Sequence, residues 1–351
     1  MARCFPIFDC SSVVAEQILD NMHCDILFEL SLLSKKAFTL VQNATLLSKQ
    51  SSFLKVVASS STSVELSRGD ERIEWHFYGK RDSGRSELEG LERKTVKVQN
   101  ETSGVVRELV FAKICNGFYG CPFNCIQDVL LFIQHISSLF NSTVQMLKIH
   151  ASQFSSLKAI QSVEELKTSR AVIIEKGTVT NVEMHQIIGG FESKSVQIVC
   201  NPAPDFTHNH KILISDFRTF ESSWFKGPML LNIDCEHMII RSNNVSEEDV
   251  NKFLHQWMKS LTGCGRIWYL VIGKGSRDRE SVYQNARCQP KWNLEKVTHG
   301  LSGFQDPLFL RDSNSYRRTI DDMVMKIVVD NEKSPPESFL IIRAVCYMKR
   351  P

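Results

Sequence analysis

The sequence predicts an α/β fold that begins with a small helical part. One observation is a run of apolar side chains at helical spacing between residues 5 and 42. Another is a series of short β-branched clusters between residues 146 and 272, with helical patterns between several of them. A pair of strand-like segments, 324–330 and 339–347, closes the chain. Together these patterns indicate helices first, then strands and helices in alternation, then a terminal pair of strands.

The opening segment contains short amphipathic patterns. Apolar side chains form two stripes, the first with Val13, Val14, Ile18, Leu19 and Met22 and the second with Ile26, Leu30, Leu33, Ala37 and Val41. Ser11 or Ser12 can cap the first helix, and Asp25 can cap the second. A unit this short cannot bury all of its apolar surface alone. We therefore expect this surface to dock onto another polypeptide; the alternative is that the core of a larger domain fills both stripes.

These residues resemble the F-box, a three-helix motif that binds the Skp adaptor of SCF-type (cullin–RING) ubiquitin ligases. The matching positions are Phe5-Pro6, Val14, Glu16, Ile18, Asn21-Met22, 28–32, 34–36 and Leu40-Val41. Cys10-Ser11 stands where many F-boxes have Leu-Pro, so the entry to the first helix is less rigid. The resemblance implies that these residues face the adaptor or pack the helices together: Phe5, Pro6, Val14, Ile18, Leu19, Leu27, Leu30 and Ser34.

Composition narrows the class of protein. A chain of 351 residues exceeds one average domain, so we expect two units, one small and one large. A net charge of +3, with basic and acidic residues mixed, argues against a nucleic-acid partner. The chain has no run of 18 apolar residues, which predicts no membrane span, and Asp9 argues against a signal peptide. An odd number of scattered cysteines, 11, indicates reduced thiols in the cytoplasm or nucleus, or both.

The region after the opening segment predicts a change of structure. The Ser-rich stretch 48–63 reads as a boundary, although Phe53, Leu54, Val56 and Val57 predict that part of it packs. Strand patterns follow at 73–78, 95–99 and 105–111. We therefore predict three parts, listed by residue range as a docking domain at 1–45, a β-rich lead-in or linker at 46–115, and a larger domain at 116–351.

The larger domain shows a regular alternation. Strand-like clusters recur at steps of about 25 residues in most cases, at 146–149, 171–174, 196–199, 212–214, 238–240 and 268–272. Helical patterns lie at 126–140 and at 246–261, where Ser246 and Asp249 supply a helix-start signal. This alternation predicts a leucine-rich-repeat-like α/β domain with parallel strands and a C-terminal β-hairpin over its open end. An ordinary layered α/β domain with unequal connections is the alternative.

The stretch from residue 212 to residue 272 resembles the type-2 F-box-associated domain. The matching positions are 211–214, Trp224, 235–239, 242–244, 246–254, Trp257 and Tyr269-Leu270. In that family the domain follows an F-box in the same chain and selects targets for ubiquitination. On the strand at 146–149, Lys148 and His150 alternate with inward-facing apolar residues, so they are candidates for a target-facing surface.

Other chemistry is weakly indicated. Consecutive residues such as Asp234-Cys235-Glu236-His237 at the entry to a strand point to opposite faces and cannot all bind one metal. Cys115, Cys121 and Cys125 lack a second Cys/His pair, and the run 273–276 has the wrong order for a phosphate loop. Trp224 and Trp257 are candidate pocket-lining residues, but Trp257 lies in the apolar stripe of its helix and is expected in the core. We therefore predict no catalytic residue, no metal and no cofactor.

The resulting hypothesis is a non-enzymatic substrate-recognition subunit of an SCF-type ubiquitin ligase. The F-box would bind the Skp-type adaptor, and through it a cullin–RING ligase, while the C-terminal domain would hold a protein target of unknown identity. No nucleic acid and no membrane are expected as partners. The alternative is a stand-alone leucine-rich-repeat-like scaffold that does not recruit a ligase.

Overall fold

The structure is a computed structural model that describes residues 10–48, 50–79, 93–99, 106–114, 117–123, 126–220, 223–259, 267, 269–274, 294–299, 315–317, 323–330 and 338–346. The chain divides within β8 (Ala171–Ile174) into two compact units, residues 1–172 and 173–351. The predicted functional boundaries at residues 45 and 115 stay predictions, because compactness does not mark where a docking segment ends.

The first unit begins with three helices, which we call the opening helices: α1 (Ser12–Asp20), α2 (Cys24–Ser31) and α3 (Lys35–Leu47). Its strands are β1 (Ser52–Ala58), β2 (Ser61–Arg68), β3 (Glu71–Gly79), β4 (Arg93–Gln99), β5 (Val106–Ile114), β6 (Gly117–Phe123) and β7 (Thr143–Ile149). Its other helices are α4 (Ile126–Phe140), η4 (Ala151–Ser156), α5 (Leu157–Gln161) and α6 (Glu164–Lys167). The strand order is β4-β5-β6-β3-β2-β1-β7, parallel at β3/β6 and β1/β7 and antiparallel at the other pairs.

Strands β1 and β2 begin within the Ser-rich stretch 48–63, which confirms that part of this stretch packs. Side chains of β1 alternate between buried and more exposed positions along its whole length, and so do those of β2. The two strands pair antiparallel from Ser52↔Arg68 to Val57↔Ser63. Serine at the outward positions 61, 63 and 67 of β2 lowers the hydrophobicity of that strand without disturbing the two-residue period that a half-buried strand requires. The Ser-rich composition therefore hides the strands, whereas the alternation of apolar and polar residues indicates them.

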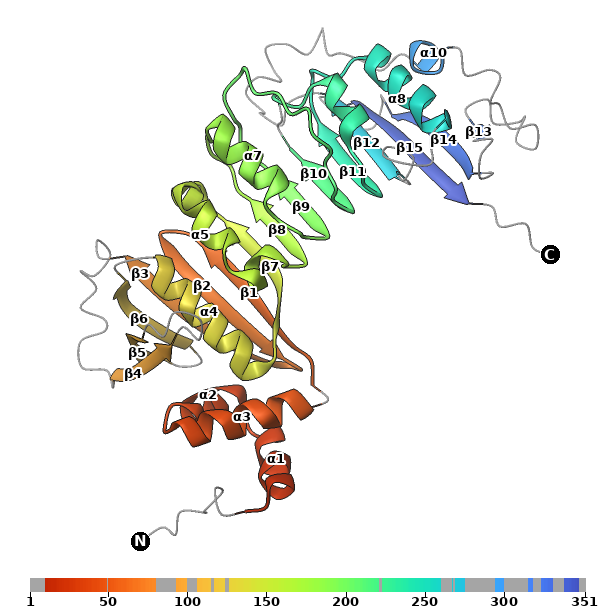
Figure 1. Cartoon of the computed structure of the whole chain (residues 1–351). Helices are drawn as coiled ribbons and strands as arrows, with labels where there is room; N and C mark the ends of the chain where they lie inside the picture. Colours follow the sequence, from red (N-terminus) through yellow and green to blue (C-terminus); the bar gives the residue numbers. More distant parts are fainter. Residues whose placement is uncertain are drawn as a thin grey trace, which may run out of the picture. The chain divides into compact units, whose positions relative to one another are not determined.

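Aromatic side chains form the core of the first unit. Phe132 of α4 packs against Trp75, Phe77 and Phe111, with ring centroids 5.4, 5.2 and 5.3 Å away. Trp75 and Phe77 are two residues apart on β3 and therefore share one face of the sheet. Helix α4 lies over this face, as Figure 1 shows. The opening helices lie beside one end of α4 in the same view, which places them at the edge of this aromatic core.

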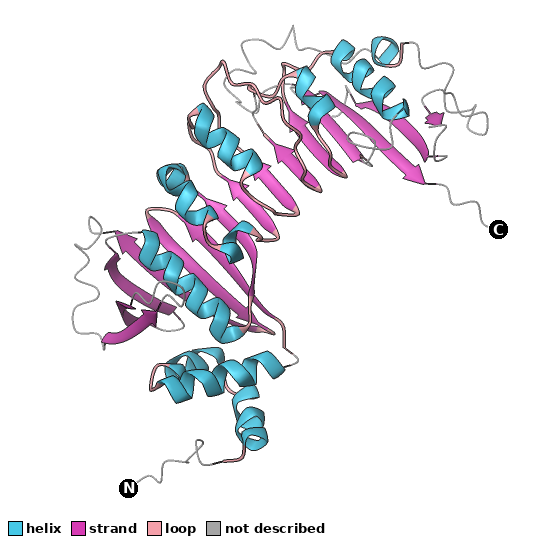
Figure 2. Ribbon diagram, in the orientation of Figure 1, coloured by secondary structure: helices cyan, strands magenta, loops and turns pink. Residues whose placement is uncertain are grey.

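The second unit contains α7 (Asn181–Gly189), β9 (Ser195–Ile198), β10 (Asp216–Thr219), η5 (Gly227–Asn232), β11 (His237–Arg241), α8 (Glu247–Lys259), β12 (Tyr269–Lys274), α10 (Leu294–Val297), β13 (Ser315–Arg317), β14 (Met323–Asp330) and β15 (Ser338–Cys346). The strand order is β9-β10-β11-β12-β15-β14-β13. Pairs from β9 to β12 are parallel, and pairs from β12 to β13 are antiparallel. Helices α7 and α8 cover one face of this sheet (Figure 2).

These features confirm the predicted α/β class, with an N-terminal helical part and an open sheet whose strands β9 to β12 are parallel. The expected terminal strands are β14 and β15, which pair antiparallel; the turn with Pro335-Pro336 lies outside the described residues. The leucine-rich-repeat-like form of the domain stays a prediction.

One expected strand is wrong. The segment 212–214 forms an isolated bridge between Ile212 and Ile233, and the strand in this region is β10, a few residues later. Both segments alternate: Ile212 and Ile214 are buried around an exposed Leu213, and Phe217 and Thr219 are buried in β10. Alternation shows which side chains point inward, but it does not show which backbone pairs with a neighbour.

Helix starts also differ from the expected caps. Ser11 is the N-cap of α1, but its side chain makes no capping hydrogen bond. His23, and not Asp25, is the N-cap of α2, since Asp25 lies in the first turn of that helix. The start of α8 follows the prediction: Ser246 Oγ accepts from the Asp249 N–H, and Asp249 Oδ2 accepts from the Ser246 N–H.

Candidate functional site

The opening helices carry most of the exposed large apolar side chains in the described part of the chain. Nine such residues are exposed, and six belong to this short segment. These six, which we call the outer apolar residues, are Val13, Val14, Ile26, Leu33, Leu46 and Leu47. Their exposure ranges from 44% for Val14 to 71% for Leu33. Exposed apolar groups concentrated on one small element are typical of a protein interaction site.

The opposite side of the opening helices is sealed against the sheet of the same unit. Leu19, Leu27 and Phe28 are fully buried. The ring of Phe28 meets Trp75 and Phe118 edge to face, each with centroids 5.2 Å apart. Such pairs add about 0.5–1.5 kcal/mol to the apolar burial itself. The opening helices are therefore packed as part of the first unit.

Polar contacts reinforce this junction from the strands. Arg68, at the end of β2, is buried, and its Nη2 donates to Asp20 Oδ1 at 2.8 Å, while its Nη1 donates to the Met22 carbonyl at 3.3 Å. Lys113 of β5 donates to Asp25 Oδ2 at 2.6 Å and to Glu29 Oε1 at 2.9 Å. Its hydrogen bond to Asp25, and then that to Glu29, raises the pKa of Lys113. Each ion pair joins one of the first two helices to a strand.

Helix α3 is fixed to α4 in the same way. Thr45 Oγ1 donates to the Leu139 carbonyl at 2.6 Å. Gln42 Nε2 donates to Ser138 Oγ at 2.8 Å. Both contacts join residues more than 90 positions apart, so no local sequence pattern predicts them. They make α3 the bridge between the opening helices and the helix that covers the sheet.

The structure sorts the predicted adaptor residues by exposure. Phe5 and Pro6 lie outside the described residues. Val14 is exposed, and Ile18 and Leu30 are half-buried. Leu19 and Leu27 are buried and serve helix packing, and Ser34 Oγ accepts the Ala37 N–H at the start of α3.

Three exposed positions, Val13, Ile26 and Leu33, belong to the apolar stripes but were not among the predicted contacts. The stripes also contain residues that pack inward. Sequence spacing therefore found the apolar faces without assigning each face to the interior or to the surface.

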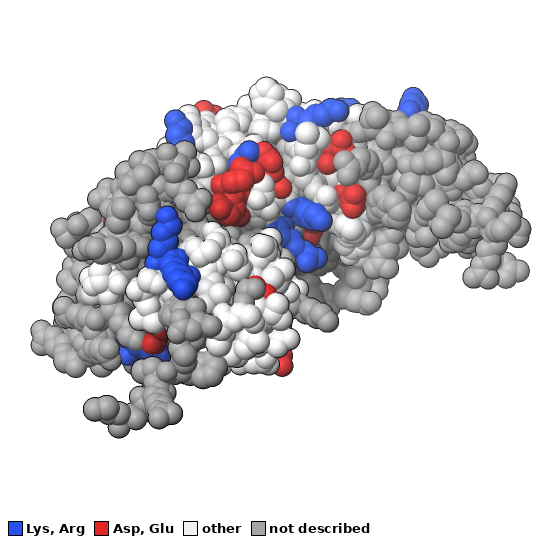
Figure 3. All heavy atoms as spheres, turned by 60° about the horizontal axis from the view of Figure 1, so that its bottom comes forward, with Lys and Arg blue, Asp and Glu red and all other residues white. Residues whose placement is uncertain are grey.

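The predicted target-facing residues lie on and just after β7. Leu147 and Ile149 are fully buried, whereas Lys148 and His150 are half-buried, so the expected alternation is confirmed. Lys148 and His150 both have interaction partners within the chain. On the face drawn in Figure 3, the coloured basic and acidic side chains lie in small separate groups with uncharged surface between them.

Aromatic residues pack the region around residues 206–259 of the second unit. Trp257 is buried, as predicted, and Trp224 is buried as well. The Trp257 Nε1–H donates to the Ile267 carbonyl at 3.2 Å, and Trp224 meets Phe206 edge to face with ring centroids 5.8 Å apart. Gly227 is required by close approach, because a Cβ there would lie within 1.9 Å of the Asp249 carboxyl group. The packing fixes α8 against η5.

Three histidines stand at the edge of this core. His208 is 5% exposed, and its Nδ1 lies 3.1 Å from Nδ1 of His185 on α7. Burial, helped by the nearby His185 and His210, lowers the pKa of His208 to about 4. One of the two facing Nδ1 atoms donates to the other, which requires at least one neutral ring.

A hollow of about 460 Å³ opens in the same unit between the end of α7 and the approach to β10. Leu213, 68% exposed, lines it together with Lys194, Lys211, Phe191 and Glu192. An exposed leucine beside two lysines offers both apolar and cationic contact to a partner. Among the residues once considered for a metal, Cys235 is buried while His237 is exposed, and Cys115, Cys121 and Cys125 are side chains that the structure does not describe.

Comparison with known proteins bears on this region. Residues 206–266 match a family model described as F-box associated. This match confirms the resemblance of the region around residues 212–272 to an F-box-associated domain. Over 69 residues the chain is 32% identical to the E3 ubiquitin-protein ligase hecw-1 of Caenorhabditis elegans. The matched segment covers 19% of this chain and 5% of that protein. No solved structure matches the chain. The F-box-associated match does not extend to the opening helices.

Proposed function

We propose that this chain is the substrate-recognition subunit of an SCF-type E3 ubiquitin ligase. The opening helices bind a Skp-type adaptor and through it a cullin–RING ligase, and the second unit binds a protein target. The F-box-associated match at residues 206–266 is the observation that carries the proposal. The chain itself performs no chemistry. It acts by holding a target lysine near a charged conjugating enzyme, which raises the effective concentration of the two.

The outer apolar residues support the adaptor-binding half of the proposal. Full burial of one Val, Leu or Ile side chain is worth about 1.5–3 kcal/mol. Ile26 and Leu33 are 51% and 71% exposed, so a partner that covers them gains a substantial part of that free energy. The inner face is already occupied by the sheet of the first unit, and a partner therefore has only the outer face to bind.

Co-purification of the full chain with a co-expressed Skp-type adaptor tests this half. The variant Ile26→Asp with Leu33→Asp is expected to lose the adaptor, because it places two charges in the apolar interface while both side chains already face solvent. Phe53→Asp is the matched control, since Phe53 is 40% exposed on β1 of the same unit. Retention of the adaptor by the double variant would remove the proposal. Ile18 and Leu30 are poorer test sites, because they are half-buried and aspartate there also disturbs folding.

The second half concerns the target. We assign target binding to the hollow around Leu213 in the second unit. Lys148 and His150 of the first unit stay a separate prediction. Leu213→Asp and Val182→Asp form a matched pair, because the two side chains are 68% and 65% exposed in the same unit. Quantitative mass spectrometry of proteins co-purified from cells is expected to show partners lost only in Leu213→Asp, with the adaptor retained in both. An unchanged set of partners would place the target elsewhere.

A stand-alone scaffold is the second candidate function. It is favoured by the burial of Leu19, Leu27 and Phe28 within the first unit, because helices that pack in this way can simply complete the sheet. In that case the purified chain has no affinity for the adaptor. Among the described residues, no helix is long and apolar enough to cross a membrane. We propose the cytoplasm or nucleus as the site of action, on the basis of the odd and scattered cysteines.

A further inference from the structure

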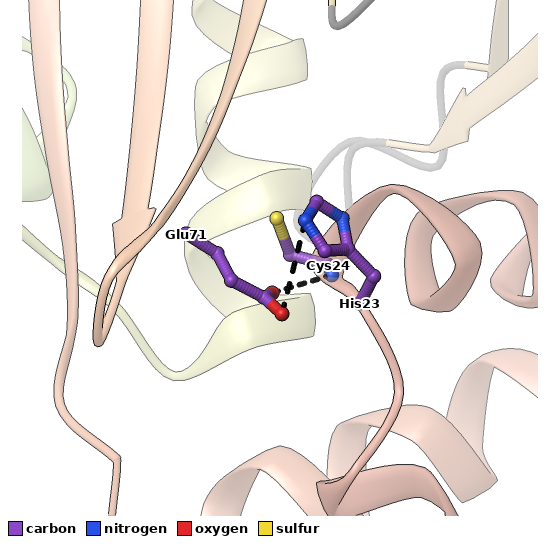
Figure 4. Close-up of side chains that lie close together, drawn as sticks. All are labelled: His23, Cys24 and Glu71. Carbon is purple, nitrogen blue, oxygen red and sulfur yellow. Dashed lines mark hydrogen bonds and ion pairs between the residues drawn. The ribbon is translucent and has the colours of Figure 1, made fainter.

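Three side chains with metal-binding atoms meet where the opening helices join the sheet. His23 is the N-cap of α2, Cys24 is the first residue of that helix, and Glu71 is the first residue of β3. Their ligand atoms all lie within 4.8 Å of one another. Figure 4 shows the imidazole of His23 and the carboxylate of Glu71 on either side of Cys24. Among the described residues, this is the one such group of three or more.

The orientation of His23 suits metal binding. Its Nδ1 lies 2.8 Å from Asp25 Oδ1, and its Nε2 lies 3.8 Å from Glu71 Oε1. Asp25 is held in turn by Lys113, whose Nζ is 2.6 Å from Asp25 Oδ2. A carboxylate behind one ring nitrogen fixes the tautomer of a histidine and directs the other nitrogen toward a metal. Here that other nitrogen faces Glu71.

The carboxylate of Glu71 already joins the strand to the start of α2. Glu71 Oε2 accepts the Cys24 N–H at 2.9 Å, which by itself explains the position of the carboxylate at the start of α2. The thiol of Cys24 lies beside the same carboxylate, within 4.8 Å of it and of the His23 ring nitrogen. A divalent cation between the two groups would balance both the thiolate and the carboxylate.

We propose that His23 Nε2, Cys24 Sγ and the Glu71 carboxylate bind a zinc ion. The mixture of one thiolate, one imidazole and one carboxylate matches the ligand set that zinc accepts. Zinc–ligand bonds of about 2.0–2.3 Å place ligand atoms of a tetrahedral site about 3.3–3.8 Å apart. The present spacing therefore closes by about 1 Å, which the half-exposed side chains of His23 and Glu71 allow. A water molecule completes the coordination.

Binding is a ligand exchange with no redox step. The Cys24 S–H bond breaks, the sulfur forms a bond to zinc, and the proton passes to solvent. The product links α2 to β3 and so fixes the opening helices to the sheet. This inference does not depend on the proposed function, because its test measures metal and not adaptor.

Cobalt(II) titration of the full-length chain, purified without metal, tests the site. Bound cobalt should give visible bands of a tetrahedral site together with a thiolate-to-metal band in the near ultraviolet, at one cobalt per chain, and zinc should abolish both. Cys24→Ser should lose the thiolate band. His23→Gln, which alters a side chain that is 50% exposed, should weaken binding at least 10-fold and leave the fold unchanged by circular dichroism.

Cys10→Ser is the matched control, because Cys10 is also a free cysteine near the opening helices, and it should leave the spectrum unchanged. Absence of the thiolate band from the wild-type chain overturns the proposal. So does its persistence in Cys24→Ser, its loss in Cys10→Ser, or unaltered affinity in His23→Gln. If Cys24→Ser does not fold, the His23→Gln titration decides alone.

Discussion

The opening helices and the F-box-associated segment at residues 206–266 use apolar side chains in different ways. The opening helices combine a buried inner face with six outer apolar residues. In the described part of residues 206–266, Leu213 is the single large apolar side chain that is exposed, and Phe206, Trp224 and Trp257 are buried. One region is thus apolar on two sides, and the other gathers its apolar groups into one core. In the opening helices apolar residues form both a core and an exposed surface, whereas in residues 206–266 they form mainly a core.

Helix α2 shows the contrast within eight residues. Leu27 and Phe28 point into the first unit, whereas Ile26 is 51% exposed and Leu33, just beyond the helix, is 71% exposed. A helix that is apolar on every side is normally covered on every side. The sheet covers one side of α2, and the proposed adaptor covers the other.

This arrangement changes which experiments are informative. A fragment of residues 1–50 lacks Trp75 and Phe118, the aromatic partners of Phe28, so it does not represent the native helices. Removal of residues 1–45 would expose the same aromatic groups in the remaining chain. A large loss of stability after that truncation is therefore expected for a ligase subunit and for a scaffold alike. Point variants in the full chain distinguish the two.

The largest expected effect comes from Phe28→Ala. Removing a ring buried among Trp75, Phe118 and Phe132 should lower the free energy of unfolding by about 3–5 kcal/mol, through lost burial and a cavity. Chemical denaturation followed by tryptophan fluorescence measures it. Phe53→Ala, at a side chain that is 40% exposed, should cost only about 1 kcal/mol. Equal effects of the two variants would break the distinction between inner and outer faces.

The next effect is a pH dependence in the second unit. The pKa of His208 is lowered from 6.5 to about 4 in the folded state, so the unfolded chain binds its proton first as pH falls. The contribution of His208 to the free energy of unfolding is therefore complete above pH 6.5 and is lost between pH 6.5 and 4. At about 1.36 kcal/mol per pKa unit, this loss is about 3 kcal/mol.

Denaturation curves at several pH values measure this loss. His208→Gln should flatten the dependence, while His237→Gln, at an exposed position, should preserve it. The groups facing His208 are His185 on α7 and His210, and a positive charge on either one opposes protonation of His208. Identical pH profiles for the wild type and His208→Gln would contradict the assignment.

A smaller effect tests the polar part of the junction. Asp20→Ala should cost about 2 kcal/mol, because it leaves the charge of Arg68 buried without its partner. Arg68→Met should cost only about 1 kcal/mol, since Asp20 is 40% exposed and water can replace its partner. Denaturant unfolding of both single variants and the double variant forms a thermodynamic cycle. The reverse order of the two costs would mean that Arg68 is not the dominant buried charge.

The smallest effect lies in the F-box-associated segment. Ser246→Ala removes the Oγ that accepts the Asp249 N–H and should cost about 1 kcal/mol. Thr180→Ala at the equivalent capping box of α7 should cost a similar amount, which makes it a matched comparison. Thermal unfolding measures both. A clearly larger cost at Ser246 would show that the contact between Asp249 and the close-packed Gly227 also depends on the cap.

Local patterns in the sequence predicted a substantial part of this fold. The helix expected at 126–140 is α4, and the strand expected at 171–174 is β8, both with the predicted bounds. Such elements can be predicted because their apolar residues recur at a regular spacing and their ends carry clear start and stop signals. The segment at 212–214 failed because two neighbouring stretches alternate equally well. Strands β2 and β6 were not predicted, because serine in β2 and glycine and proline in β6 obscured their patterns.

The candidate sites were predicted less well, and the residues show why. The apolar stripes placed Leu27 and Leu33 on equal terms, yet Leu27 is fully buried and Leu33 is 71% exposed. The ion pairs of Arg68 and Lys113 were not predicted, because their partners in α1 and α2 are 48 and 88 residues distant in the chain. Contacts of that span depend on strand order, which local patterns do not encode.

By itself the sequence determined the helix and strand periods, the capping box of α8 and the F-box-associated character of residues 206–266, since each depends on residues close together in the chain. Tertiary structure decided which apolar face of α2 meets the sheet and which meets solvent. It also brought His23 and Cys24 beside Glu71. The physical reason is that an amphipathic pattern specifies that a surface must be covered, while only the packing of distant strands specifies what covers it.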